Sequence, residues 1–363
     1  MPVLLFFVIL LVLVLAHEFG HFIVAKKAGI RVDEFAFGFP PRLFSKKFGE
    51  TTYSFNALPL GGYVKIYGEN PDDVSEHNRK RSFIGKPRYI QALVIVAGIV
   101  FNLLLAWVLL STTLMIGISA PVDSEDGYAV TNPKIMITGV HEGAPASRAG
   151  LLSGDVIEHL SDGRDSVEAT TPESVSGFIG VHEGRPVTLT YMRKGETKDV
   201  ILSPVSGISP SGAAIGIYMD EVGTLRLPIH KALWVGAIKT YQYTQMTAVG
   251  TYSFILAAIV GHADFAQVSG PIGIVHAVGE AAGLGIANLL LFTASISVSL
   301  AVFNILPFPG LDGGRFLFIV IEAITRKPIP PKVANAFNLG CLVLLMLLLI
   351  VVSYHDVLKY YLK

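Results

Sequence analysis

The sequence contains almost no cysteine and little charge. Cys341 is the one cysteine among 363 residues, so an internal disulfide framework and a zinc site built from cysteines are both excluded. Charged residues make up only 15% of the chain, and 28 basic residues balance 28 acidic ones, which leaves no net charge to attract nucleic acid. No period of 20–50 residues repeats along the chain, and no low-complexity tract is present.

Apolar residues are abundant instead, at 52% of the chain. This share predicts a membrane protein with room for one further folded domain. Four stretches are long and apolar enough to cross a bilayer, which takes about 20 residues each. They are residues 2–25, 90–117, 287–307 and 336–354. The first lacks a basic start and a small-x-small cleavage site, so we expect a retained helix rather than a signal peptide.

The segment between the second and third apolar stretches has a different amino-acid composition. Residues 121–225 are rich in Gly, Pro, Ser and acids, and contain short alternating runs such as VTLTYM and KDVILS. This pattern is typical of strands and turns in a small folded domain. The predicted organisation is therefore a membrane part at 1–120, an inserted β-rich domain at 121–225 and a second membrane part at 226–363.

Basic residues near the apolar stretches predict the orientation, because cytosolic loops carry an excess of lysine and arginine. The basic clusters are Lys26, Lys27, Arg31, Arg42, Lys46 and Lys47; Arg79, Lys80, Arg81, Lys86 and Arg88; and Arg326, Lys327 and Lys332. If all three clusters are cytosolic, the chain starts outside and the inserted domain is extracytoplasmic. A membrane crossing at 228–262 would place the last basic cluster outside the cytosol. This apolar segment is therefore expected to be a helix lying at the outer surface.

The first apolar stretch ends in HEFGH, where His17 and His21 are four residues apart. On a helix they share one face and can bind one metal ion, with Glu18 beside them to polarise a water molecule. Two imidazoles, a third ligand and an open position are typical of catalytic zinc. The alternative is a pair of core histidines satisfied by neighbouring helices. Burial of His, Glu and His together in lipid is costly, which favours the metal site.

The third ligand is expected from another apolar segment at the same depth. His17 lies roughly 20 Å along its helix, past the midplane toward the cytosol. The third stretch ends on that side with NILPFPGLDGG at 304–314, which contains Asp312. Pro307 and Pro309 break the helix there, so the carboxylate need not follow helical geometry. Alone, LDGG could instead be a turn at the membrane surface.

Four motifs in this order resemble the site-2 protease family of intramembrane zinc metalloproteases, and within it the bacterial RseP-like branch. They are HEFGH, PLGGYVK at 59–65, SGPIGI at 269–274 and NILPFPGLDGG. The resemblance implies a polytopic α-helical membrane protein with about four transmembrane helices, a membrane-associated β-hairpin and one inserted extracytoplasmic β-rich PDZ-like domain.

The same resemblance implies the roles of individual residues. His17, His21 and Asp312 would bind one Zn²⁺, Glu18 would be the general base, and Asn304 would contact the substrate backbone. Gly61, Gly62 and Tyr63 of the PLGGYVK motif are further candidates for substrate binding. The family often has Gly-Pro-x-x-Asn in its second core helix, whereas this chain has GIVFN at 98–102, which we expect to alter only a local kink.

Residues 32–68 alternate apolar and polar side chains in short runs, and Lys46, Lys47 and Gly49 mark a turn. This predicts a cytosolic-side hairpin near the active site. Its sheet edge could pair with a substrate helix that has been unwound into a strand. The alternative is a surface hairpin with no role in substrate binding.

The insert has its own signal, because GVHEGAPASRAGLLSGDVIEHLSDG at 139–163 resembles the strand, short helix and turn of PDZ domains. In the family such a domain is thought to exclude bulky substrates until another protease has trimmed them. A generic β-rich spacer is the alternative. His141, His159 and His182 in this insert are expected to be solvated surface residues rather than ligands.

The predicted function is therefore zinc-dependent hydrolysis of transmembrane helices at the cytosolic side of a bacterial inner membrane. Substrates would be membrane-tethered regulators such as anti-sigma-factor-like proteins, trimmed beforehand by a site-1-type protease, or remnant signal peptides. Membrane lipid is the other expected partner, and nucleic acid is not. The alternatives are an inactive relative that binds membrane helices as a scaffold, and a metal transporter, for which no ladder of acidic or His residues is present.

Overall fold

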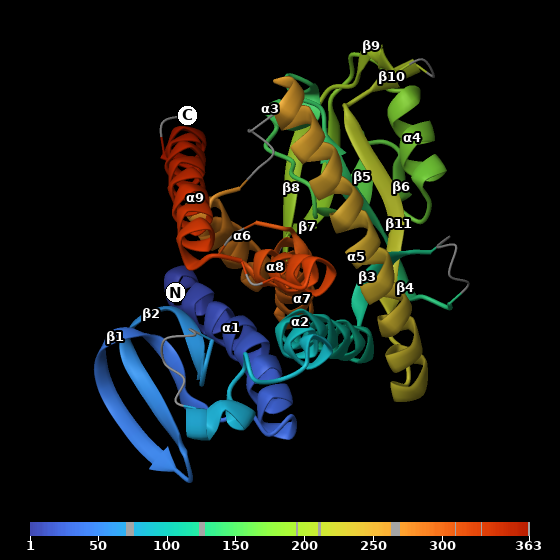
Figure 1. Ribbon diagram of the computed structural model, residues 1–363. Coiled ribbons are helices and arrows are strands. Elements are labelled where there is room, and N and C mark those ends of the chain that lie inside the picture. The colour runs from blue at the N-terminus through green and yellow to red at the C-terminus, as the bar shows by residue number, and fades with distance from the viewer. Residues whose placement is uncertain are drawn as a thin grey trace. The chain divides into compact units, whose positions relative to one another are not determined.

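The computed structural model (Figure 1) divides into two compact units. The first comprises Met1–Thr113 and Ile229–Lys363, and the second Leu114–Pro228. The structure describes residues 1–69, 76–122, 128–193, 195–209, 212–262, 269–308, 310–327 and 329–361. Pro309, one of the two predicted helix breakers, lies outside the described residues.

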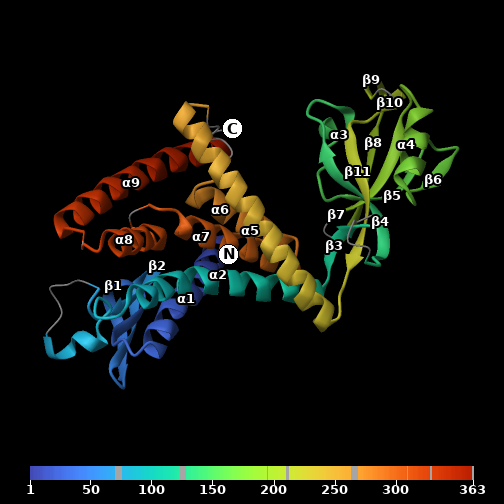
Figure 2. The ribbon, with the colours of Figure 1, turned by 45° about the vertical axis from the view of Figure 1, so that its right-hand side comes forward.

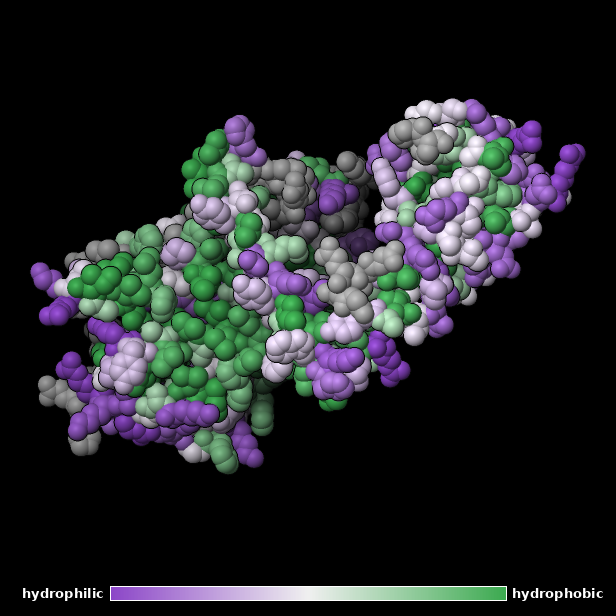
Figure 3. All heavy atoms as spheres, turned by 90° about the vertical axis from the view of Figure 1, so that its right-hand side faces the viewer, coloured by the Kyte–Doolittle hydropathy of each residue, from purple (hydrophilic) through white to green (hydrophobic). Residues whose placement is uncertain are grey.

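The first unit consists of helices and one small sheet (Figure 2). Its described helical elements are α1 (Pro2–Lys27), η2 (Glu76–Arg81), α2 (Arg88–Ile116), α5 (Ile229–Val260), α6 (Pro271–Gly283), α7 (Ile286–Ile305), α8 (Asp312–Thr325) and α9 (Pro331–Tyr361). Figure 3 shows a broad apolar surface over this unit, as expected for helices whose solvent is lipid.

By length and composition, four described helices could cross a membrane: α1, α2, α5 and α7. A multi-pass membrane protein is therefore confirmed in outline, and α1, α2 and α7 cover the first three predicted crossings. The fourth predicted crossing, 336–354, lies within the single long helix α9. Helix α5 has the length and composition of a crossing as well, so its expected position at the membrane surface stays a prediction.

Small side chains bring the central helices close together. A Cβ on Gly20 of α1 would lie 2.5 Å from the carbonyl oxygen of Ala97 in α2, so only glycine allows this approach. On its other side α2 packs against α7 through a buried cluster that includes Ala106, Ala294 and Val298. In a bilayer the hydrophobic effect does not drive helices together, because lipid tails are as apolar as the side chains. Helices there associate largely through close packing of small residues. Helix α2 is thus held between α1 and α7.

The sheet of the first unit is the expected hairpin, formed by β1 (Val32–Phe48) and β2 (Thr51–Ile66). Both strands are so long that they pair more than once. Ala36 is opposite Tyr63 and also opposite Ser54, so residues 34–37 lie between two segments of β2. The end of β2, around 62–66, pairs with β1 on one side, and no described strand pairs with its other side.

The second unit is a β-rich domain with two short helices. Its main sheet has the order β3-β11-β4-β5-β7-β8, with β6 beside β5, and β9 and β10 form a separate pair. The strands are β3 (Ile118–Pro121), β4 (Thr131–Val140), β5 (Val156–Ser161), β6 (Ser166–Glu168), β7 (Val187–Arg193), β8 (Glu196–Leu202), β9 (Val205–Ser209), β10 (Gly212–Ala214) and β11 (Ile217–Leu225); the helices are α3 (Pro145–Arg148) and α4 (Pro172–Gly180). The range 139–163 forms the predicted strand, short helix, turn and strand.

His182 corrects one expectation, because it is buried rather than solvated, with 6% of its surface exposed. Its Nδ1 lies 2.7 Å from the carbonyl oxygen of Phe178 at the end of α4, and its Nε2 lies 3.1 Å from Asp162 Oδ2. Backbone amides of Asp165 and Arg164 donate to the same carboxylate and lower the pKa of Asp162 to about 2. His182 therefore joins helix α4 to the loop after β5.

An ion pair between a buried carboxylate and a partly exposed guanidinium stabilises the second unit. The carboxylate of Asp155 is 1% exposed and accepts two 2.6 Å bonds from the Arg193 guanidinium and one from the backbone amide of Leu152. Removal of Arg193 leaves the buried Asp155 carboxylate without its counter-charge and so destabilises the domain.

We predict that Arg193→Met increases hydrogen exchange of the backbone amides in β4, β5 and β7 of the full-length protein, because it leaves the Asp155 carboxylate unpaired. Lys198→Met is the matched control, since Lys198 pairs with Glu196 on the exposed surface. Equal exchange in the two variants, measured by mass spectrometry, would contradict the role of the pair between Asp155 and Arg193.

Candidate metal centre

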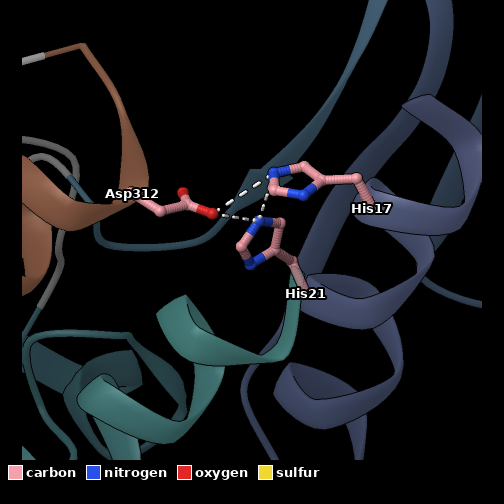
Figure 4. Close-up of side chains that lie close together, drawn as sticks. All are labelled: His17, His21 and Asp312. Atoms are coloured by element: carbon pink, nitrogen blue, oxygen red, sulfur yellow. Dashed lines mark hydrogen bonds and ion pairs between the residues drawn. The ribbon is translucent and has the colours of Figure 1, made fainter. Parts of the chain in front are cut away.

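Helix α1 places its two histidines on one face. His17 and His21 are one turn apart, and their Nε2 atoms lie 3.2 Å from each other (Figure 4). Both histidines lie within one unbroken helix, which runs from Pro2 to Lys27 and is aliphatic before them. Because both residues belong to one helix and are four positions apart, the backbone already brings the two imidazoles to one face before any ligand binds.

The third side chain of the cluster comes from the start of α8. Asp312 is the first residue of this helix, and its Oδ2 lies 3.2 Å from Nε2 of His17 and 3.2 Å from Nε2 of His21. The turn between α7 and α8 depends on Gly313, where a Cβ would overlap the carbonyl oxygen of Leu306 and lie 2.5 Å from that of Ile305. The predicted LDGG segment therefore folds back tightly and directs its carboxylate at the imidazoles.

The three atoms form a triangle of equal sides, which fits a single metal ion. A tetrahedral zinc site with metal–ligand bonds of ~2.0–2.1 Å has edges of about 3.3–3.4 Å. Oδ2 of Asp312 is buried, and no hydrogen-bond donor satisfies it among the described residues. An orphaned carboxylate oxygen that faces two imidazole nitrogens is the arrangement expected where a cation binds. The donor set of two His and one Asp suits zinc and leaves a fourth position open.

Helix α2 supports the imidazoles from behind. Nδ1 of His21 donates to the carbonyl oxygen of Val94 at 2.8 Å, which leaves its Nε2 free as a ligand. One turn further along α2, a Cβ on Gly98 would overlap Nε2 of His21 and lie 2.7 Å from Cε1 of His17. Glycine at this position thus makes room for both rings.

Asn102 is a site residue that was not predicted from the sequence. It is fully buried on α2, and its side-chain nitrogen lies 3.3 Å from Nδ1 of His17. Gly98 and Asn102 are four residues apart, as His17 and His21 are. Each pair therefore lies on one face of its helix, and these two faces are in contact. That shared spacing is the signal in the sequence that could have identified Asn102.

A cavity of about 530 Å³ opens beside the cluster. All of the predicted site residues line it: Glu18 from α1, Gly61, Gly62 and Tyr63 from β2, Asn304 from α7, and the three candidate ligands. Glu18 packs against the end of β2, because a Cβ on Gly62 would lie 3.5 Å from its Cγ and 3.0 Å from Val14. The cavity therefore brings together a metal centre, a carboxylate and a strand.

Comparison with known proteins agrees with this site, since the sequence model of peptidase family M50 matches residues 5–348. The chain belongs to peptidase family M50. The predicted resemblance to site-2 proteases is thereby confirmed, and the chain is a zinc metalloprotease of the membrane. Zinc is likewise confirmed as the cofactor of the family, and the His, His and Asp cluster has the geometry to hold it.

Relatives of the family cover almost the whole chain. A Clostridium perfringens protein whose name assigns it provisionally to the zinc metalloproteases is 34% identical over 347 residues, which are 95% of each chain. The zinc metalloprotease RasP of Oceanobacillus iheyensis is 27% identical and covers 97% of each chain. RasP of Geobacillus kaustophilus is 28% identical and covers 98% of each chain. The individual roles of His17, Glu18, His21 and Asp312 stay predictions that the geometry above supports.

We predict that Gly98→Ala weakens zinc binding by about tenfold or more, because the added methyl group displaces both imidazoles. Zinc content of the purified protein, measured by atomic emission at increasing concentrations of a chelator, checks this. Gly250→Ala in α5 is the control, since a Cβ there has no heavy atom of the described residues within 4 Å. Unchanged zinc retention in Gly98→Ala would contradict this packing account.

Proposed function

We propose that this zinc metalloprotease hydrolyses a peptide bond within transmembrane helices of membrane-tethered regulators or remnant signal peptides. The observation that carries the proposal is the cluster of His17, His21 and Asp312 within a bundle of apolar helices. A binding scaffold would not need three converging metal ligands with an orphaned carboxylate oxygen. A transporter would need ligands along a path, whereas these three converge at one point.

Glu18 is proposed as the general base and acid. Zinc, when bound by the three ligands, polarises the scissile carbonyl and acidifies the attacking water. Glu18 lines the same cavity, one residue from His17, and takes the proton of that water. It then delivers the proton to the nitrogen of the leaving amine, which completes the hydrolysis.

The substrate is proposed to bind as a strand along the end of β2. A helix hides its peptide bonds, so it must unwind locally before the carbonyl can reach the site. Residues 62–66 pair with β1 on one side and have no described strand on the other, and Gly61, Gly62 and Tyr63 line the cavity. An unwound substrate can add to this edge through backbone hydrogen bonds. Asn304 of α7 lines the same cavity and can donate its amide to the substrate backbone.

The hairpin of β1 and β2 is proposed to associate with the cytosolic side of a bacterial inner membrane, where the active site would open. Apolar side chains are exposed on it, including Leu43, Phe44, Phe48 and Phe55. Exposed Phe and Leu side chains can bury at the boundary between headgroups and acyl chains, and anionic lipid attracts nearby lysines. This orientation places the inserted domain outside the cytoplasm.

The inserted domain at 121–225 is proposed to be PDZ-like and to control access to the site. A groove of about 590 Å³ runs between α4 and the strands that follow β9, with Ile179, Ile215 and Ile217 among its lining residues. An extended segment or chain terminus can bind in such a groove. The domain would exclude regulators, such as anti-sigma-factor-like proteins, until a site-1-type protease has removed their outer domains.

We predict that Glu18→Gln abolishes cleavage, by a factor of roughly 10² or more, without loss of bound zinc, because it removes the proton carrier and keeps the ligands. Co-expression with tagged single-span proteins, followed by immunoblotting and by zinc analysis of the purified enzyme, checks both effects. Full cleavage by the variant, or cleavage by the wild type that persists without zinc, would contradict the mechanism.

The proposed substrate strand makes a separate prediction. In a Glu18→Gln, Cys341→Ala background, cysteines placed at Tyr63 and Lys65 should form disulfides with substrate cysteines that are two residues apart, since strands have a period of two. Lys47→Cys, on the segment of β1 that pairs with Thr52, is the control. Cross-links spaced three or four residues apart would show a helical substrate and contradict the proposal.

A further inference from the structure

The side chain of Asn102 has an unusual set of neighbours. It is 0% exposed, and its Nδ2 faces Nδ1 of His17 at 3.3 Å. Its Oδ1 is also buried, and no hydrogen-bond partner satisfies it among the described residues. A buried amide with an orphaned oxygen and a nitrogen that faces an imidazole requires an explanation.

The chemistry of His17 supplies that explanation. Its Nε2 points at Oδ2 of Asp312 and Nε2 of His21, so this nitrogen must offer its lone pair to the metal. A neutral imidazole then carries its proton on Nδ1, which becomes a donor. The Asn102 amide nitrogen is a donor as well and cannot accept this proton. With the metal site formed, two donors would face each other across 3.3 Å.

A rotation of the Asn102 amide by 180° about its Cβ–Cγ bond removes the conflict. The two ends of an amide have nearly the same shape, and the hydrogen-bond network decides which end is oxygen. After the rotation, Oδ1 accepts from Nδ1–H of His17 and is no longer orphaned. The amide nitrogen then takes the position of Oδ1, which is buried in a residue that borders the 530 Å³ cavity.

The position of Asn102 is itself fixed by the helix packing. Ser297 of α7 is fully buried and donates its hydroxyl to the backbone oxygen of Asn102 at 2.7 Å. Along α2, the carbonyl of Val94, the open space at Gly98 and the side chain of Asn102 follow one another at intervals of four residues. One face of α2 thus offers an acceptor to each imidazole, with Val94 serving His21 and Asn102 serving His17.

We propose that Asn102 is a positioning residue for the metal centre: its amide oxygen accepts a hydrogen bond from Nδ1–H of His17 and so keeps Nε2 as the metal-binding nitrogen. Partners of this kind orient the ring and raise its basicity, and their loss typically weakens metal binding by about 10–100-fold. The inference rests on the zinc chemistry of the family and not on the proposed substrate.

Zinc affinity of the purified, substrate-free protein tests it, measured by competition with a graded series of chelators. Asn102→Leu, which keeps the size and removes the acceptor, should weaken zinc binding by about tenfold or more. Asn102→Asp keeps an acceptor oxygen and should bind zinc at least as tightly as the wild type. Asn288→Leu is the matched control, since Asn288 bonds to the carbonyl oxygen of Leu284 on an exposed face and should leave the affinity unchanged. Wild-type affinity in Asn102→Leu, or an equal loss in Asn102→Leu and Asn102→Asp, overturns the proposal.

A second measurement needs only the wild type and the aspartate variant, in case the leucine variant does not fold. In zinc-loaded protein labelled with ¹⁵N-histidine, Nδ1 of His17 should carry a hydrogen-bonded proton, and its resonance should move in Asn102→Asp. An unprotonated Nδ1 at His17, or a resonance that does not move, overturns the proposal. Neither measurement involves cleavage, so failure of the proposed substrate would leave both results unaffected.

Discussion

Polar groups enclosed by apolar helices must find partners, and the metal centre of this protein is where that constraint is strongest. His17, His21 and Asp312 lie together at mutual distances of 3.2 Å, with an oxygen that no described donor satisfies. In lipid such a cluster is stable only when a cation or a fixed hydrogen-bond network compensates it. The surrounding helices are arranged so that they hold the two imidazole nitrogens and the carboxylate oxygen at these distances.

Three glycines make that arrangement possible. Gly20 lets α1 approach the backbone of α2, Gly98 leaves space for the two imidazoles, and Gly313 lets the start of α8 fold back onto the end of α7. A methyl group at any of these positions would overlap or crowd backbone or ring atoms that cannot move independently. The site is therefore defined as much by missing side chains as by the ligands themselves.

Much of the site could be predicted from the sequence, because its chemistry follows local patterns. HEFGH fixes two ligands by helical spacing, and the aspartate follows from a polar break at the same depth in another apolar stretch. Asn102 was not predicted because its function exists only after α1 and α2 pack. The four-residue spacing of Gly98 and Asn102 is visible in the sequence, but it does not by itself show that this face of α2 meets His17. His182 was misjudged for a related reason, since its burial depends on the Asp162 loop and the end of α4. The double pairing of Ala36 was equally hidden, because alternation predicts strands but not their neighbours.

X-ray absorption at the zinc edge of the purified wild-type protein tests the central claim most directly. The account predicts a first shell of nitrogen and oxygen at about 2.0–2.1 Å with the scattering of two imidazoles, and loss of one ligand or of the zinc in Asp312→Ala. A shell that contains sulfur or more than two imidazoles, or a spectrum that Asp312→Ala leaves unchanged, would contradict it.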